Sequence, residues 1–315
     1  MTSYTKFALL LASDYPATRY RLRGCVNDAN AIRSFLINSR GFAPNNIVTI
    51  YDRAMTRAAI LTAFDQLVAR SRAIAATGAT PAFFLHYSGH GLRLRQNGDR
   101  RAFRETAAAD YNDMDGDEAI VPYDVDRAGV LRDDLLNARL IKPLHPATQL
   151  FVLTDCCNSG TNLDLPYKGL TRISDDPDLA ASIVHLAGSQ DWQLSSEVNG
   201  MGLTTKRFLE VIGSSAKSVA TLRAVMGDLS LGSNIQHPQV SVSKASLVDG
   251  SLFPWLVGAV RTSGTGGGST TGKKDKRELS KAEETLSFLR EARAARKAQQ
   301  TQTLGVLASF LARVV

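Results

Sequence analysis

The segment Gln149–Thr161, QLFVLTDCCNSGT, is an apolar run that stops at a polar, cysteine-containing sequence. The segment Phe83–Gly91, FFLHYSGHG, has the same form and ends on a histidine flanked by glycines. Short apolar runs of this kind are typical of buried strands in a parallel sheet. In open α/β sheets, ligands bind beyond the carboxyl ends of the strands. The two segments therefore predict neighbouring strands that present His90 and Cys157 to one crevice.

Short apolar runs alternate with helical patterns through the rest of the first 260 residues. Strands are predicted at Phe7–Ala12, Ile47–Tyr51, Ala82–Tyr87, Gln149–Thr154 and Ser182–Ala187, with an edge strand at Gln239–Lys244. Apolar residues at three- and four-residue spacing predict helices at Asp28–Ser39, Thr56–Arg72, Val130–Leu140 and from Thr204 to about Val219. The predicted fold class is α/β, with a mainly parallel sheet covered by helices on both faces.

The chain has 315 residues, of which 44% are hydrophobic. This suffices for one α/β domain of about 200–260 residues plus an appendage. Three cysteines, two of them adjacent, argue against a disulfide framework and favour a reducing, cytoplasmic location. The short apolar run after Lys6 lacks a signal-peptide cleavage pattern. No stretch approaches the roughly 20 apolar residues of a transmembrane helix, so we expect a soluble protein.

Residues 261–274, RTSGTGGGSTTGKK, are predicted to form a flexible linker, because this composition cannot build a packed core. The linker separates a folded domain at residues 1–260 from a helical tail at residues 275–315. Ser280 and Glu283 form a capping-box pattern at the start of the tail helix. Four alternatives are open for this helix: it is solvated, or it docks on the folded domain, on a partner or second copy, or on a membrane surface.

The net charge of +7 and the isoelectric point near 9.4 are compatible with nucleic-acid or membrane binding. The distribution of the charged residues along the chain argues against such binding. The segment from Lys273 onward carries ten Lys or Arg residues against five acidic residues, so most of the excess charge lies in the tail. Since charge runs of this kind are usually solvated, no nucleic-acid partner is expected.

Cys157 and His90 are residue types that work together in nucleophilic catalysis. A thiol with a pKa near 8.5 is mostly protonated at pH 7, so it needs a base to become a thiolate. A nearby imidazole can take the proton and later deliver it to a leaving amine. The neighbourhoods of Gly91 and Gly160 offer backbone N–H groups for the oxyanion. A zinc site built from His86, His90, Cys156 and Cys157 is an alternative, although adjacent cysteines suit tetrahedral geometry poorly.

Six segments carry a family resemblance and lie in the family's order: Leu22–Asn30, Tyr87–Gly91, Asp115–Asp124, Asp155–Thr161, Ala187–Glu197 and Gly202–Ile212. With them the chain resembles the metacaspases, a group of caspase-like cysteine peptidases. The resemblance implies a caspase-like three-layer sandwich in which Cys157 and His90 form the catalytic dyad. It also implies a large-subunit region up to about residue 165 and a small-subunit region at about residues 180–260, as in type I metacaspases without the N-terminal prodomain.

The resemblance implies cleavage of proteins or peptides after Arg or Lys. It places Asp28, Ser88 and Asp155 in the first specificity pocket, with Cys25 close by. A cationic side chain in a partly desolvated pocket needs a carboxylate partner, and two carboxylates hold a guanidinium better than one. Asp28 has an alternative role as the N-cap of the following helix. Asp155 has an alternative role in orienting the cysteine loop.

A polar loop between His90 and Asp124 is rich in carboxylates. Such a cluster either stays solvated or recruits a hard cation such as Ca²⁺, which takes six to eight oxygen ligands. The resemblance implies activation by Ca²⁺, bound outside the catalytic dyad. The resemblance places the ligands in this loop and in the segment after the catalytic cysteine, which implies Asp113, Asp115, Asp117 and Asp164.

Two further hypotheses concern processing and activity. The segment Pro166–Asp178 contains Lys168 and Arg172, where a peptidase specific for Arg or Lys could cut its own chain.

Two positions depart from the family pattern: Asn158 follows the nucleophile where many members have His, and Ser189 stands where Cys is more usual. Neither removes a dyad member. The alternative to a cysteine endopeptidase is an inactive caspase-fold scaffold that binds partners through its C-terminal tail.

Overall fold

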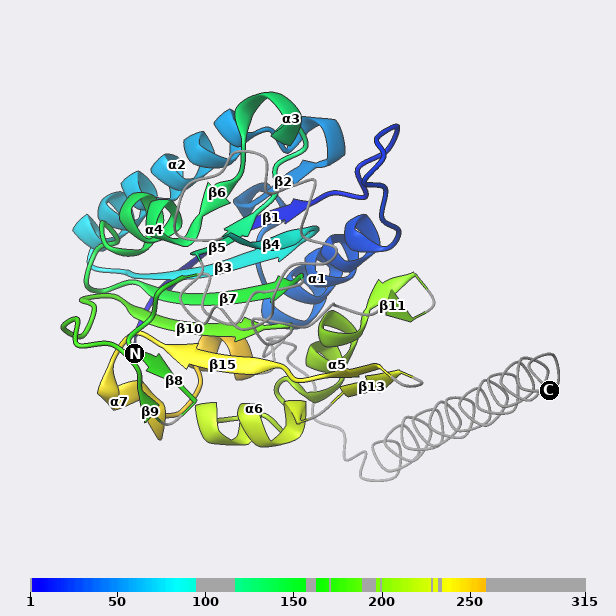
Figure 1. The fold of residues 1–315 in the computed structure, drawn as a ribbon. Helices are drawn as coiled ribbons and strands as arrows, with labels where there is room; N and C mark the ends of the chain where they lie inside the picture. The colour runs from blue at the N-terminus through cyan, green and yellow to red at the C-terminus, as the bar shows by residue number, and fades with distance from the viewer. Residues whose placement is uncertain are drawn as a thin grey trace, which may run out of the picture. The chain divides into compact units, whose positions relative to one another are not determined.

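The central sheet has eight strands, in the order β2-β1-β3-β7-β10-β15-β8-β9 (Figure 1). Their bounds are β1 Tyr4–Ala12, β2 Ile47–Tyr51, β3 Thr80–Ser88, β7 Gln149–Asp155, β8 Tyr167–Lys168, β9 Thr171–Arg172, β10 Ser182–Ala187 and β15 Gln239–Val242. The pairs from β2 to β10 are parallel, whereas β15, β8 and β9 continue the sheet in antiparallel fashion. The mainly parallel sheet and its strands are thus confirmed.

The structure is a computed structural model that describes residues 2–94, 117–156, 163–169, 171–188, 197–198, 200–227, 229–231 and 234–258. It separates two units, Met1–Leu229 with Gln236–Val260, and Ser230–Ile235 with Arg261–Val315. The first unit holds the eight-stranded sheet. The linker predicted at residues 261–274 and the tail predicted at residues 275–315 lie outside the described residues.

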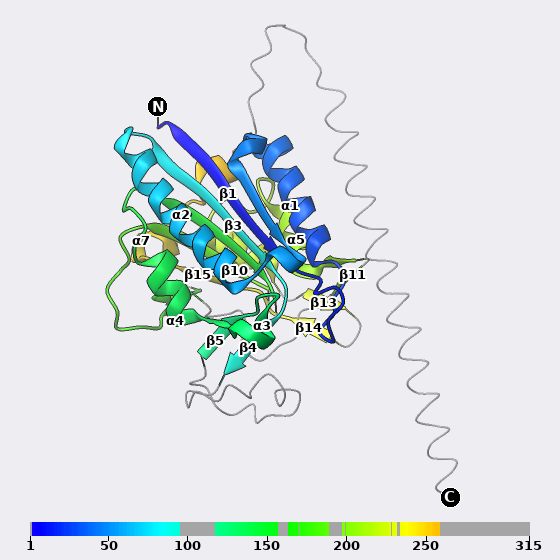
Figure 2. The same cartoon turned by 90° about the horizontal axis from the view of Figure 1, so that it is seen from above.

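Helices cover both faces of the sheet (Figures 1 and 2). On one face, side chains of β1, β3 and β7 pack against α2 (Arg57–Ala76) and α4 (Asp133–Leu136). On the other face, alternate residues of the same strands pack against α1 (Cys25–Arg40), α5 (Leu203–Val211) and α6 (Val219–Met226). Because successive strand residues point to opposite faces, each strand supplies both hydrophobic cores. The predicted three-layer α/β architecture is confirmed.

The smaller elements are three short sheets and several helical turns. Three short sheets are formed by β4 Gly91–Leu94 with β5 Asp117–Ile120 and β6 Leu131–Arg132, by β11 Glu197–Val198 with β12 Met201–Gly202, and by β13 Leu229–Leu231 with β14 Asn234–Gln236. Short helical turns occur at Pro44–Asn46, Asp52–Ala54, α3 Val125–Ala128, Asn137–Ile141, α7 Ala245–Val248 and α8 Pro254–Val257. Within the described ranges, no helix is long and apolar enough to cross a bilayer.

Two predicted helices differ from the structure. The helix expected at Val130–Leu140 begins as strand β6, because Leu131 pairs with Ile120 of β5, and only then continues as helical turns. The helix expected from Thr204 to about Val219 ends at Val211. Gly213 then adopts a left-handed conformation with φ 82°, which breaks the helix. A capping box at Ser218 starts α6 as a separate helix.

Three stacked aromatic rings fix α5 against the centre of the sheet. Phe151 of β7 stacks on Phe84 of β3 with ring centroids 5.6 Å apart, and on Phe208 of α5 at 5.4 Å. Stacked aromatic pairs add stability beyond the area that they bury. This stack therefore determines where the first turn of α5 lies relative to the carboxyl ends of β3 and β7.

Two buried histidines interrupt the apolar interior. The Nδ1 atom of His86 is 3.1 Å from the carbonyl oxygen of Leu153, and the Nε2 atom of His185 is 2.8 Å from the hydroxyl of Thr154. Burial lowers the pKa of His86 to about 4 and that of His185 to about 3. Both imidazoles are therefore neutral structural groups at pH 7.

These histidines make the free energy of unfolding depend on pH. Below pH 6.5 the unfolded chain binds protons that the folded chain cannot bind, so stability falls as the pH falls from 6.5 toward about 4. For two imidazoles the expected loss between pH 7 and pH 5 is about 3–4 kcal/mol, measured by urea unfolding at both values. The variant His185→Gln should lose about half of this difference. An identical pH dependence in the variant would contradict the assignment.

Candidate active site

The side chain of His90 is oriented by a backbone carbonyl. His90 follows the carboxyl end of β3, and its Nε2 atom lies 2.7 Å from the carbonyl oxygen of Tyr20. Since a carbonyl oxygen only accepts hydrogen bonds, Nε2 carries the proton of the neutral ring. The other ring nitrogen, Nδ1, is therefore the basic one. Burial lowers the pKa of His90, an effect opposed by the bond to Tyr20, so the ring is neutral at pH 7.

The segment that leads to Cys157 leaves the sheet beside the one that leads to His90. Strands β3 and β7 are parallel neighbours, and Ser88 pairs directly with Asp155 in their register. His90 is two positions beyond Ser88, and Cys157 is two positions beyond Asp155. Cys157 itself lies outside the described residues. The predicted neighbourhood of the two strand ends is confirmed, and the contact between thiol and imidazole remains a prediction.

The zinc alternative is not supported by the described residues. His86 bonds to the carbonyl of Leu153 inside the sheet. Cys156 belongs to the hydrophobic core on the α2 side, whereas His86 shares the opposite face of β3 with Phe84, which packs on the α1 side. His86 and Cys156 thus lie on opposite faces of the sheet and do not converge on one ion.

Asp28, Ser88 and Asp155 come together at the carboxyl ends of the strands. The hydroxyl of Ser88 donates to Oδ2 of Asp28 at 2.8 Å. The backbone N–H of Gly202 donates to Oδ1 of Asp28 at 2.8 Å, and that of Thr205 donates to Oδ2 of Asp155 at 2.8 Å. Both carboxylates are almost fully buried. The structure thus gathers the three predicted specificity residues, and the start of α5 holds the two acids.

Gly202 lies directly between the two carboxylates. A Cβ atom at this position would lie 2.9 Å from Oδ2 of Asp28 and would overlap Oδ2 of Asp155 at 2.1 Å. Real Cβ atoms do not make such close approaches, so only glycine fits here without displacing an acid. Cys25 is buried one helical turn before Asp28 on α1, which agrees with the predicted proximity.

Asp28 does not cap α1. The N-cap position belongs to Gly24, and the carbonyl of Gly24 accepts the backbone N–H of Asp28. The side chain of Asp28 is turned inward, toward Ser88 and Gly202. The N-cap alternative is therefore wrong.

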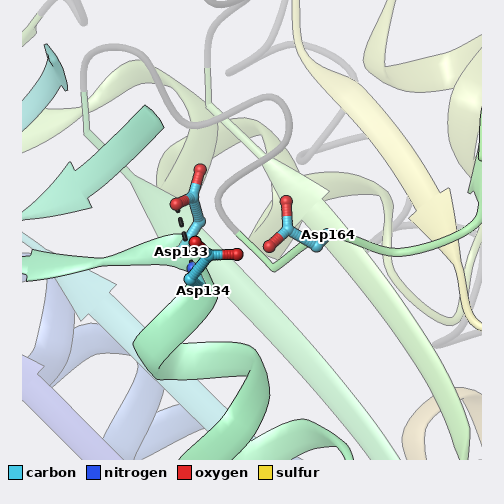
Figure 3. A group of neighbouring side chains, drawn as sticks. All are labelled: Asp133, Asp134 and Asp164. Atoms are coloured by element: carbon cyan, nitrogen blue, oxygen red, sulfur yellow. Dashed lines mark hydrogen bonds between the residues drawn. The ribbon is translucent and has the colours of Figure 1, made fainter. Parts of the chain in front are cut away.

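Three other carboxylates gather near the start of α4 (Figure 3). One oxygen of each of Asp133, Asp134 and Asp164 lies within 4.8 Å of the others. The carboxylate of Asp133 is tied to the backbone, because it accepts the N–H of Glu118 at 2.7 Å and that of Asp134 at 2.9 Å. Asp164 has a left-handed backbone with φ 48°. We call Asp133, Asp134 and Asp164 the three-aspartate cluster.

Of the four predicted metal ligands, only Asp164 is a member of the three-aspartate cluster in the part of the chain that the structure describes. Asp113 and Asp115 lie outside the described residues, as does the side chain of Asp117, whose backbone forms the start of β5. Asp133 and Asp134 are not among the predicted ligands, because the apolar spacing of their segment predicts the interior of a helix. Their signal is the adjacent acidic pair itself, which begins α4.

The comparison with known families decides the identity of the chain. A model of the metacaspase peptidase C14 domain matches residues 6–166. Metacaspase-1 from Saccharomyces cerevisiae is 30% identical over 250 residues, which cover 77% of this chain and 50% of that protein. The chain belongs to the metacaspases. Metacaspase-1 from Arabidopsis thaliana is 34% identical over 164 residues, or 51% of this chain and 41% of that protein.

A solved structure supports the fold of this metacaspase. Protein GSU0716 from Geobacter sulfurreducens matches with a TM-score of 0.54 and 22% identity, over 80% of this chain and 99% of that chain. This likeness concerns the fold alone. The metacaspase described here spans about half the length of the Saccharomyces cerevisiae relative, and the match to the family model covers the region that contains His90, Asp155 and Cys157.

The groups that hold Asp28 and Asp155 of this metacaspase could not be predicted from the sequence. Gly202 lies 174 positions from Asp28, and Thr205 lies 50 positions from Asp155. Both act through backbone N–H groups, which every residue except proline has, so their side chains give no signal. The segment Gly202–Ile212 was recognised as part of the family pattern without a role being assigned to it.

Proposed function

We propose that this metacaspase is a cysteine endopeptidase in which Cys157 is the nucleophile and His90 the general base. The observation that carries the proposal is the register of β3 and β7, with Ser88 opposite Asp155. Because of this register, His90 and Cys157 each follow a paired strand position by two residues. The bond from Nε2 of His90 to Tyr20 supports the proposal further, because it leaves Nδ1 as the proton acceptor.

The proposed reaction moves one proton in each half. Nδ1 of His90 takes the thiol proton of Cys157, and the sulfur attacks the scissile carbonyl to form a tetrahedral intermediate. The carbonyl of Tyr20 accepts a hydrogen bond from Nε2–H and so stabilises the imidazolium. His90 then protonates the leaving amine, the C–N bond breaks and a thioester forms. Water, deprotonated by His90, hydrolyses the thioester and restores the thiol.

We infer that the preferred residue before the cleaved bond is Arg or Lys. The buried carboxylates of Asp28 and Asp155 both lie next to Gly202. The hydroxyl of Ser88 and the backbone N–H groups of Gly202 and Thr205 are among their hydrogen-bond partners. A guanidinium or ammonium group beside the two acids would bring a full positive charge to them and form strong, charge-assisted hydrogen bonds. A substrate aspartate would add a third negative charge and be repelled.

Peptide cleavage tests the dyad and the specificity together. We expect turnover of fluorogenic peptides with Arg or Lys before the cleaved bond and none with Asp. Cys157→Ala should lower kcat about a thousandfold or more. Asp28→Asn should lower kcat/KM for the Arg peptide about 10- to 100-fold, equivalent to about 1.4–2.7 kcal/mol.

The matched control is Asp65→Asn, because Asp65 is an exposed carboxylate of α2 paired with Arg139. It should leave kcat/KM within about twofold of the wild type. Wild-type protein that cleaves none of the peptides, either with or without Ca²⁺, would instead support the inactive scaffold. Equal cleavage by Asp28→Asn and the wild type would contradict the specificity assignment alone.

We propose that Ca²⁺ activates the protein by binding the three-aspartate cluster. Carboxylate oxygens are the ligands that Ca²⁺ prefers, and two of the three acids, Asp134 and Asp164, are exposed to solvent. Asp164 follows Cys157 by seven positions, whereas Asp133 and Asp134 begin α4. A cation bound here would neutralise the repulsion among these acids and tie the chain after the nucleophile to α4.

Calcium binding can be measured without any substrate. Ca²⁺ should raise the midpoint of thermal unfolding, with a stabilisation of about 2.7 kcal/mol at a concentration one hundred times the dissociation constant. Asp134→Asn should reduce this shift and raise the calcium concentration needed for full activity about tenfold or more. Glu210→Gln, which changes an exposed acid of α5, is the control. A wild-type midpoint that does not respond to Ca²⁺ would refute the site.

We propose that self-processing at Lys168 or Arg172 is slow compared with peptide turnover. Lys168 pairs with Ser241 of β15 inside the main sheet. The guanidinium of Arg172 donates to the hydroxyl of Tyr167 at 3.0 Å and to the carbonyl of Asp176 at 2.6 Å. Since a peptidase binds its substrate with the side chain in its own pocket, the β8–β9 hairpin must first leave the sheet.

Gel electrophoresis over time follows this cleavage. With Ca²⁺ present, fragments should appear more slowly than peptide is turned over. The double variant with Lys168→Gln and Arg172→Gln should remain intact, whereas the control Lys142→Gln, an exposed lysine elsewhere, should be cut like the wild type. A wild-type chain that stays full length while it cleaves peptide would exclude self-processing.

A further inference from the structure

Two buried tyrosines meet beside the backbone of His90. Tyr15 follows the end of β1, and Tyr87 lies near the end of β3. Both side chains are almost completely buried, and their hydroxyl oxygens are 3.3 Å apart. The ring of Tyr15 also packs against the imidazole of His90, with centroids 4.8 Å apart and planes inclined by 42°.

The two hydroxyl groups bridge the backbones of His90 and Val121 in a reciprocal pattern. Tyr15 accepts the N–H of His90 at 3.1 Å and donates to the carbonyl of Val121 at 2.7 Å. Tyr87 accepts the N–H of Val121 at 3.1 Å and donates to the carbonyl of His90 at 2.6 Å. Each phenol has one proton to give, and each gives it to a carbonyl. All four backbone groups are thereby bonded.

This pattern interrupts a regular antiparallel ladder. Strands β4 and β5 pair Gly91 with Ile120, so the next opposed positions are His90 and Val121. One direct bond remains there, from the N–H of Val121 to the carbonyl of His90 at 3.2 Å. The N–H of His90 reaches Val121 only through the hydroxyl of Tyr15. The phenols therefore hold the histidine backbone at a place that the ladder alone does not define.

Gly89 is shaped to this pair. A Cβ atom at position 89 would lie 2.8 Å from the hydroxyl oxygen of Tyr15 and 2.8 Å from that of Tyr87. Any larger residue would push the phenols away from His90. Burial raises the pKa of both tyrosines above the ordinary value, so both hydroxyls stay protonated and able to donate.

We propose that Tyr15 and Tyr87 are positioning residues that set the place of the His90 imidazole relative to Cys157. The inference rests on the proposed peptidase function. The carbonyl of Tyr20 fixes the ring at Nε2, and the two phenols fix the backbone that carries the ring. Together these contacts determine where Nδ1 lies. Neither phenol takes part in the proton transfers; both act through His90.

The test compares Tyr15→Phe and Tyr87→Phe with the wild type, at a temperature where circular dichroism shows each protein folded. Each variant should lower kcat about 10- to 100-fold, because a small displacement of a catalytic group is costly, while KM changes less than about threefold. Alkylation of Cys157 by iodoacetamide, followed from pH 5 to 9, should require a higher pH in both variants. That readout depends on the pairing of thiol and imidazole and uses no substrate.

Two further variants separate positioning from general destabilisation. Ser71→Ala removes another buried hydroxyl that bridges two backbone groups, the carbonyl of Val68 and the N–H of His145, near the amino end of β7. It should lose stability yet keep kcat and the alkylation profile within about twofold. Gly89→Ala keeps every hydrogen-bonding group but overlaps both phenols, and should lower kcat as the tyrosine variants do.

The outcomes distinguish this inference from the proposed function. An inactive wild type, with alkylation of Cys157 that shows no depressed thiol pKa, would remove the function itself. An active wild type with folded Tyr15→Phe and Tyr87→Phe variants that match its kcat and alkylation profile would overturn the positioning role alone. Equal losses in Ser71→Ala and the tyrosine variants would also overturn it.

Discussion

The parallel ladder between β3 and β7 is the constraint on which the site depends. It sets Ser88 opposite Asp155, so the residues that follow leave the sheet side by side. Because side chains alternate between faces, a slip of one residue would turn Asp155 toward α2, away from Asp28. Both strands carry apolar residues on both faces, so a slip would expose neither core; its cost would come from misfitting side chains in two close-packed cores and from placing Asp155 in one of them. The packing of the two cores thus fixes the geometry of a polar site.

Burying the carboxylates of Asp28 and Asp155 is unfavourable, and hydrogen bonds from the start of α5 offset part of this cost. Backbone N–H groups at the first turn of a helix lack intrahelical partners and carry partial positive charge. Two of them, at Gly202 and Thr205, bond to the acids. The aromatic stack of Phe151 on Phe208 holds α5 in place for these bonds. The same packing that stabilises the core therefore also keeps two carboxylates apart from water.

The features that local patterns carry could be predicted from the sequence. Apolar runs predict the parallel strands, and the family motifs point to Asp28 and Asp155, which the structure brings together. Features that a tertiary contact decides could not be predicted in this way. Asp133 was assigned to a helix interior because its apolar neighbours have helical spacing, while pairing with β5 converts the preceding residues into a strand. The roles of Gly202 and Thr205 were hidden, since backbone N–H groups leave no mark in the sequence. The position of Cys157, the flexible linker and the helical tail stay predictions, because they lie outside the described residues.

The proposed preference for Arg and Lys follows from the burial of two acids side by side. Asp28 and Asp155 are almost fully buried and accept hydrogen bonds from a hydroxyl and from two backbone N–H groups. A neutral substrate side chain that excluded water from the site would strengthen the repulsion between the two carboxylates, because the local dielectric constant would fall. A cation reverses the sign of that effect: the same loss of water strengthens its attraction to both acids. Under the proposed preference, discrimination would arise from repulsion of the wrong substrates as much as from attraction of the right ones.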